Sequence, residues 1–237
     1  MNYTLLELVQ QVTGELGVSR PTLVIGNNDP QIIQLLALVN RLGQDLCTQG
    51  EWQRLNTEYS FTTVQGQTQY ALPSDWGRQI PQTEWDRTSQ WPLIGPATTQ
   101  EWQIYKSAII SDGPNLRFRI ANNFLEVDPP TGGLNLSFYY ISKNWIDAGG
   151  GVTRKTYAAD TDRAIFDNSL MVLGLKVQWK ASKGLDPGLD LPGFRTMLDT
   201  IKAQDKSAPK LTLGGLPRNI LLTEWNIQDG FYGGVSP

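Results

Sequence analysis

The sequence predicts an α+β fold in which helices from both ends of the chain form one antiparallel four-helix bundle around an inserted, mainly β, sandwich-like domain. Apolar residues recur at helical spacing near both ends of the chain, and they alternate with polar residues in its middle. Beyond Pro209 neither period survives, which predicts an extended C-terminal arm. The expected domains are the bundle (1–56 and 157–208), the β domain (57–156) and the arm (209–237).

Two helices are expected before the β domain. The first covers residues 4–16, where Thr4 and Glu7 form a capping box. The second begins at the Asp29-Pro30 pair, with the acid at N-cap and proline at N1, and runs to about Thr48. Its apolar residues cover more than one stripe, so we expect it to be buried on two sides, within the bundle or against a neighbouring subunit.

The middle of the chain has the period of β-strands. Residues 57–63 and 68–72 alternate around a Gln65-Gly66 turn, which predicts a hairpin. Two more strands are expected at 116–120 and 134–140, with one short helix at 99–106 between the two pairs.

The stretch "GQTQYALPSDW", residues 66–76, is predicted to be a structural corner rather than a site. Its members are Tyr70, Leu72, Pro73, Asp75 and Trp76. Proline has no amide hydrogen for a ladder, so Pro73 should end strand pairing. Asp75 should then cap the turn that follows, and the Trp76 ring should pack back as an apolar plug.

Two helices should follow the β domain. The longer one is expected to begin after Asp160, with Asp160 and Asp162 near its positive end and lysines near its negative end before Gly184. A last helix should carry Phe194 and Ile201 on its apolar face. The arm beyond it is too apolar for a solvated linker, so we expect it to lie along another surface.

Composition excludes several classes of function. The net charge is −3, without a basic patch, which argues against tight binding of nucleic acid. The chain has no histidine and one cysteine, so no metal site, cofactor or thiol chemistry is expected, and Cys47 should be a buried filler. Since no long apolar run and no signal-peptide pattern occur, we expect no membrane contact and synthesis in the cytoplasm.

Three groups of residues could carry chemistry or bind a ligand, and each has a simpler interpretation. Glu84 and Asp86 resemble a glycosidase carboxylate pair, although acids at alternate strand positions are usually solvated. Trp85, Trp91 and Trp102 could stack on sugars, and Arg117 with Arg119 could contact nucleic acid. We favour core or interface packing for the tryptophans and a solvated face or salt bridge for the arginines, and we expect no enzyme.

Five segments, taken together and in order, resemble a known family. They are "MNYTLLELVQQVTGELG", "GQTQYALPSDWGR", "WPLIGPATTQEW", "YYISKNWI" and "NIQDGFYGG". The chain resembles the head-to-tail adaptor (connector) proteins of short-tailed bacteriophages, the group that includes tail tubular protein A. The resemblance covers nearly the whole chain. Trp76 and Gln228 depart from the family pattern, in which phenylalanine and proline are more common at these positions.

The resemblance implies a structural role in the virion neck. It implies a homo-oligomeric ring, of about twelve copies, that docks on the portal protein, supports the tail nozzle or tail tubular partner, and lets double-stranded DNA pass. The candidate subunit interface comprises Ile33, Leu38, Ile165 and Trp179. The candidate portal-docking arm comprises Leu211, Leu213, Leu216, Ile220, Leu222, Trp225, Phe231 and Tyr232. The alternatives are another virion tail component and a carbohydrate-binding β-domain protein.

Overall fold

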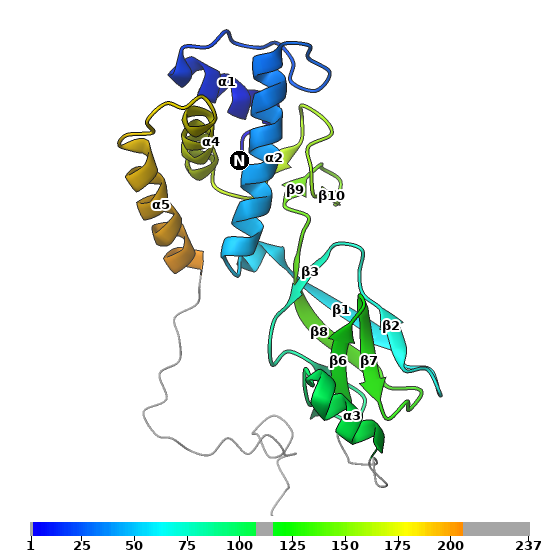
Figure 1. Ribbon diagram of the computed structural model, residues 1–237. Coiled ribbons are helices and arrows are strands. Elements are labelled where there is room, and N and C mark those ends of the chain that lie inside the picture. The colour runs from blue at the N-terminus through cyan, green and yellow to red at the C-terminus, as the bar shows by residue number, and fades with distance from the viewer. Residues whose placement is uncertain (1, 108–115, 206–237) are drawn as a thin grey trace, which may run out of the picture. The chain divides into compact units, whose positions relative to one another are not determined.

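The computed structural model describes residues 2–107 and 116–205 of the chain (Figure 1). These residues form two compact units. The helical unit comprises residues 2–57, 75–78 and 141–205, and the β unit comprises 58–74, 79–107 and 116–140. The boundaries between the units fall within three strands and between Ser74 and Asp75.

The helical unit is organised around one central helix. Its helices are α1 (Leu5–Leu16), α2 (Pro30–Gln49), α4 (Asn168–Ser182) and α5 (Asp190–Asp205), and α4 contacts each of the other three. The unit also contains a 3-10 turn (Gln53–Leu55) and a small sheet of β9 (Ile146–Asp147), β10 (Thr153–Arg154) and β11 (Arg163–Ala164), with β9 in the centre.

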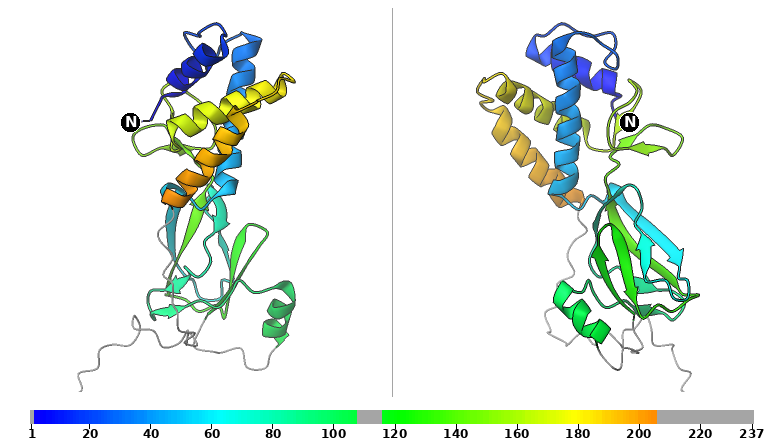
Figure 2. Two further views of the ribbon diagram at one scale, coloured as in Figure 1. Left: turned by 90° about the vertical axis from the view of Figure 1, so that its left-hand side faces the viewer. Right: turned by 45° about the vertical axis from the view of Figure 1, so that its right-hand side comes forward.

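The α+β class is confirmed, whereas a regular antiparallel four-helix bundle is not. Figure 1 shows α4 nearly end-on where α2 runs down the view. Figure 2 shows α4 lying across α2, so the two helices cross at a steep angle. Two glycines allow close approach in this unit. A Cβ at Gly43 of α2 would lie 2.2 Å from the Trp145 ring, and one at Gly174 of α4 would lie 2.9 Å from Leu42.

The helix signals were correct for the first two helices and wrong for the third. Thr4 and Glu7 form the capping box of α1, and Asp29 caps α2 ahead of Pro30. The helix α4, however, begins at Asn168 and not after Asp160. Its cap is Asp167, whose carboxylate accepts hydrogen bonds from the amides of Ser169 and Leu170. Asp160 and Asp162 serve another purpose, described below.

The β unit contains two antiparallel sheets and one helix. The larger sheet has the order β1 (Asn56–Thr62), β8 (Asn135–Ser142), β4 (Trp85–Asp86) and β5 (Trp91–Pro92), and β3 (Trp76–Gln79) also pairs with β8. The smaller sheet has the order β2 (Gln69–Ala71), β7 (Phe124–Asp128) and β6 (Arg117–Ala121). The helix α3 (Thr99–Ser107) comes between β5 and β6 in the chain.

The predicted hairpin between residues 57–63 and 68–72 is wrong. The chain does turn at Gly66, whose φ is 82°, but β1 pairs with β8 and β2 pairs with β7. The turn therefore leads from one sheet to the other. The Tyr70 hydroxyl stabilises it by accepting a hydrogen bond from the Val64 amide at 2.9 Å and donating one to the Gln67 carbonyl at 3.1 Å.

Residues 141–156, which we expected in the inserted β domain, group with the helices. The reason is that Trp145 and Ile146 are fully buried. The Trp145 ring stacks on Phe166 with 6.0 Å between ring centroids and lies over Gly43 of α2, so this stretch completes the core of the helical unit.

The predicted corner at residues 70–76 contains a buried Tyr70 and half-buried Leu72, Pro73 and Trp76. The Asp75 carboxylate accepts a hydrogen bond from the Ser142 hydroxyl at 2.7 Å, and its carbonyl accepts one from the Lys143 amide at 2.7 Å. Asp75 thus joins the residues before β3 to the end of β8.

Replacement of Asp75 by alanine should lower the free energy of unfolding by about 0.5–2 kcal/mol, because the Ser142 hydroxyl loses its acceptor. Asp75→Asn keeps one acceptor oxygen and should cost less. Urea unfolding followed by circular dichroism measures both effects. An unchanged midpoint for Asp75→Ala would show that this carboxylate does not stabilise the corner.

Candidate assembly surface

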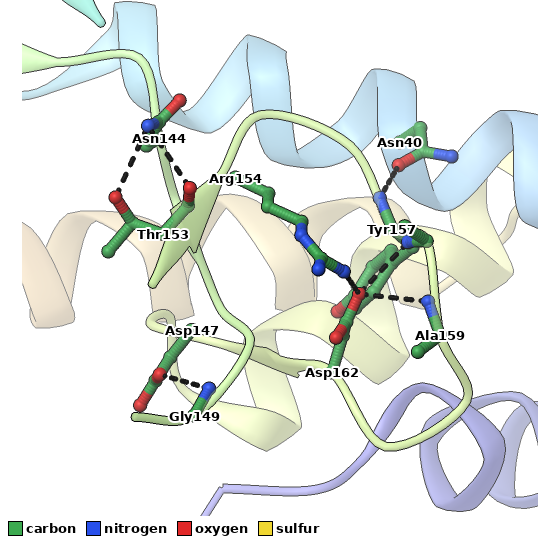
Figure 3. A network of polar contacts seen from close by, with 10 residues as sticks. Asn40, Asn144, Asp147, Gly149, Thr153, Arg154, Tyr157, Ala159 and Asp162 are labelled. Atoms are coloured by element: carbon green, nitrogen blue, oxygen red, sulfur yellow. Dashed lines mark hydrogen bonds and ion pairs between the residues drawn. The ribbon is translucent and has the colours of Figure 1, made fainter. Parts of the chain in front are cut away.

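A polar network in the helical unit holds the segment 144–164 against the helices (Figure 3). Its centre is Asp162, a residue that is 1% exposed. One carboxylate oxygen of Asp162 accepts hydrogen bonds from the amides of Ala158 and Ala159 at 2.9 and 3.0 Å. The same oxygen lies 3.3 Å from the Arg154 guanidinium, so the buried charge is paired and hydrogen-bonded.

The same segment makes backbone contacts with both N-terminal helices. The carbonyls of Asp160 and Asp162 accept hydrogen bonds from the first amides of α1, at Leu6 and Leu5. The Asp160 carboxylate accepts from the amides of Val24 and Ile25 in the α1–α2 connection. The Tyr157 amide donates to Asn40 of α2 at 2.9 Å. These contacts fix α1, α2 and the connection between them in one arrangement.

The groups of this network are suited to stabilising the fold and not to catalysis. Burial raises the pKa of the Tyr157 hydroxyl, and the nearby Asp162 charge raises it further. Tyrosine at this position therefore stays protonated at neutral pH and does not act as a base. At the surface, Asp147 accepts a hydrogen bond from the Gly149 amide at 2.8 Å, and Asn144 donates to Thr153 at 3.2 Å, which shapes the exposed glycine turn 149–151.

A second polar cluster joins three helices through ion pairs. The Lys176 ammonium of α4 lies 2.9 Å from the Glu15 carboxylate of α1 and 3.6 Å from that of Asp190 in α5. Lys180 lies 2.6 Å from Asp190. The hydrogen bond from Lys176 lowers the pKa of Glu15, and the one from Lys180 lowers the pKa of Asp190. The helix α5 contributes a single buried residue, Leu198, and its Phe194 ring lies against Gly174 of α4, so these ion pairs add to a small apolar contact.

Ile33 is the predicted interface residue with the most free surface. Its side chain is 52% exposed on α2, and Ala37 and Arg41 continue the exposed face in the next two turns. Leu38 is half-buried on the same helix. An exposed isoleucine beside alanine is apolar surface that the core of the single chain does not use.

Two other predicted interface residues lie in different surroundings. Ile165 is half-buried and lines two neighbouring grooves, of 310 and 880 Å³, which also share Asn2 and Arg54. Trp179 is only 5% exposed, and the Lys183 ammonium lies 4.5 Å from its ring centroid. Its surface is thus already covered by its own chain. All residues of the predicted portal-docking arm lie outside the described residues.

The carboxylate pair considered from the sequence is buried and not solvated. Glu84 and Asp86 are 5% and 4% exposed. Glu84 accepts a hydrogen bond from Gln79, and burial raises its pKa. Asp86 accepts hydrogen bonds from the amides of Thr88 and Ser89. Glu84 is therefore bonded within the turn that precedes β4, and Asp86 within the turn that follows it.

In the β unit, Trp102 is buried and the two arginines lie over aromatic rings of α3, whereas Trp85 and Trp91 are half-buried. Trp102 is 1% exposed, which is incompatible with a sugar-stacking platform at this position. Arg119 forms an ion pair with Glu126 and lies 5.0 Å from the Trp102 ring centroid, while Arg117 lies 4.2 Å from that of Tyr105. The two arginines thus hold α3 on the small sheet through cation–π contacts.

Sequence reasoning missed two features of the helical unit. The first is the role of Asp160 and Asp162, whose partners are amides far away in the chain. The second is the α4–α5 connection, where Leu185 and Leu189 are 58% and 91% exposed. The Pro187-Gly188 pair beside them was a signal for a loop, and two leucines in a loop could have indicated a contact surface.

Neither a group of three potential metal ligands nor a helix able to cross a membrane occurs in the part of the chain that the structure describes.

The chain matches the SU10 adaptor protein family over residues 3–178, and it belongs to that family. It is thus a phage adaptor, a structural component of the virion that interacts with other structural proteins of the phage. The match does not confirm the narrower resemblance to tail tubular protein A, and no curated protein matches the chain significantly. The matched region ends within α4, so α5 and the arm lie beyond it.

Asp162→Ala should lower the free energy of unfolding of the helical unit by about 3 kcal/mol, because two backbone amides and the Arg154 guanidinium lose a buried acceptor. Asp162→Asn keeps one oxygen and should cost about half as much. Asp147→Ala, which removes an exposed turn contact, is the matched control and should cost less than about 1 kcal/mol. Equal urea midpoints for Asp162→Ala and Asp147→Ala would contradict the central role of Asp162.

Proposed function

We propose that this adaptor forms a ring, of about twelve copies, that docks on the portal vertex and supports the tail or nozzle while DNA passes through it. The observation that carries the proposal is the family match over residues 3–178. Within it, the helices α1, α2, α4 and α5 with their Asp162-centred segment would form the ring domain. The β unit would present a separate surface to other neck components.

Ring contacts are proposed at the exposed face of α2. Ile33 is 52% exposed and Leu38 is half-buried, so both can lose further apolar surface to a neighbouring copy. Ile165 borders two grooves and is a third candidate. Because Trp179 is buried, its proposed role is to hold α4 in place behind such contacts.

The portal contact is proposed for the arm between about Leu211 and Tyr232. Spaced apolar residues in an irregular segment suit a chain that becomes ordered when it lies on a partner. The net charge of −3 suits a conduit, because a strongly basic lumen would hold DNA through release of counterions.

Ile33→Asp should weaken association between copies by about 30-fold, since a charge in place of a buried apolar side chain costs about 2 kcal/mol at an interface. The matched control is Val64→Asp, which changes a 56% exposed side chain in the β unit. Mixtures with portal protein, analysed by sedimentation and negative-stain imaging, measure ring formation. Rings that form equally well with Ile33→Asp would exclude this face of α2 from the interface.

Truncation after Pro209 should leave a folded protein that no longer joins portal rings. Circular dichroism and gel filtration establish that the shortened chain is folded, and co-sedimentation with portal measures docking. If the shortened chain sediments with portal as well as the full chain does, the arm is not the docking element.

A further inference from the structure

The outer edge of β1 lacks the protection that the chain gives to its other sheet edges. Natural sheets shorten, charge or cover their edge strands, because unpaired amides and carbonyls attract other strands. At the edge of the small sheet, the backbone of Ile94 exchanges hydrogen bonds with Leu116 and Phe118 of the β6 region. At the edge of β11, Thr4 forms a bridge with Arg163. The edge strands β2 and β5 have only three and two residues.

The strand β1 is the exception among the described residues. It has seven residues, lies at the end of its sheet and pairs with β8 alone. Its sequence, NTEYSFT, contains no lysine or proline, which are the usual protective residues at an edge.

The backbone direction of the edge follows from Thr63. Its amide donates to the Leu134 carbonyl at 2.8 Å and its carbonyl accepts from the Gly133 amide at 2.9 Å, so both groups face the β8 side. Backbone groups alternate in direction along a strand, with a period of two residues. The backbone amides and carbonyls of Tyr59 and Phe61 therefore point towards β8. Those of Glu58, Ser60 and Thr62 point away from it.

The aromatic layer at this edge is also incompletely covered. The rings of Tyr59 and Phe61 pack against Phe138 and Tyr70, with centroid distances of 5.6 and 4.6 Å. Phe138 and Tyr70 are buried, whereas Tyr59 and Phe61 are half-buried. An added strand would satisfy the three outward residues, and apolar side chains on its inner face would cover these two rings.

We propose that residues 210–213 of this chain, Lys-Leu-Thr-Leu, add to the outer edge of β1 as a further strand. Although no period extends through the arm as a whole, these four residues alternate polar and apolar side chains between Pro209 and the Gly214-Gly215 pair, which is the pattern of a short strand. In that alternation Leu211 and Leu213 face the Tyr59 and Phe61 layer. Lys210 and Thr212 then share the polar face of Glu58, whose carboxylate already forms an ion pair with Arg87 and accepts a hydrogen bond from the Tyr139 hydroxyl.

This pairing does not depend on ring formation or on portal docking. It withdraws Leu211 and Leu213 from the proposed portal contact, leaves the later part of the arm, from Leu216 onwards, available to a partner, and would fix the point from which that part departs.

The test is amide hydrogen exchange on the full-length, isolated chain, measured by nuclear magnetic resonance. Two of the three amides of Glu58, Ser60 and Thr62 should exchange at least about tenfold faster in Thr212→Pro than in the unchanged chain, because two of the four added residues bond towards β1 and proline removes a donor and disrupts the added strand. The amides of Tyr59 and Phe61, which bond to β8, should be unaffected. Thr223→Pro, further along the arm, is the matched control and should leave all five amides unchanged.

Two outcomes overturn the proposal. Equal exchange at Glu58, Ser60 and Thr62 in the unchanged chain and in Thr212→Pro would show that residues 210–213 do not cover the edge. Protection that disappears on dilution would assign the added strand to a second copy instead of the same chain. Because no portal is present, failure here is distinguishable from failure of the docking proposal.

Discussion

The arrangement of the helical unit depends on a buried carboxylate. Asp162 is 1% exposed, and it is compensated by two amides and the Arg154 guanidinium. A buried charge is tolerated only when such partners are present in a defined geometry, so the segment that supplies them can adopt few alternative conformations. That same segment bonds to the start of α1 and to Asn40 of α2. A local electrostatic requirement thereby sets the relative positions of elements that are far apart in the chain, and with them the shape of the surface available for assembly.

Much of the fold follows from local signals in the sequence. The capping box at Thr4 and Glu7, the Asp29-Pro30 start of α2 and the buried Cys47 were predicted because each depends on residues close together in the chain or on composition. The α+β class follows from the change of period. The sequence did not predict which strands and side chains that are far apart in the chain pair with each other. The residues flanking Gly66 have the pattern of a hairpin, yet their strands pair with β8 and β7, since cross-strand packing and not the turn selects the partner.

The candidate surface was predictable only in part for the same reason. An excess of apolar positions on α2 indicated a second buried side, and Ile33 is indeed exposed in the single chain. Trp179 belongs to the same periodic pattern but is covered by its own unit, because period alone does not say which of two apolar stripes the core uses. The predicted surroundings of two pairs of acids were wrong. Glu84 and Asp86 were expected in solvent and are buried, and Asp160 and Asp162 were expected at a helix start but serve distant backbone amides.

The attachment of α5 has a consequence for the order in which the helical unit opens. With Leu198 as its one buried residue and Asp190 paired to two lysines of α4, this helix relies on interactions that dissolved salt weakens to a greater degree than α4, which contacts three neighbouring helices. Its local opening therefore requires less free energy than global unfolding, and the difference grows with ionic strength. The helix α5 is thus the part of the helical unit that can detach first while the Asp162-centred core stays intact.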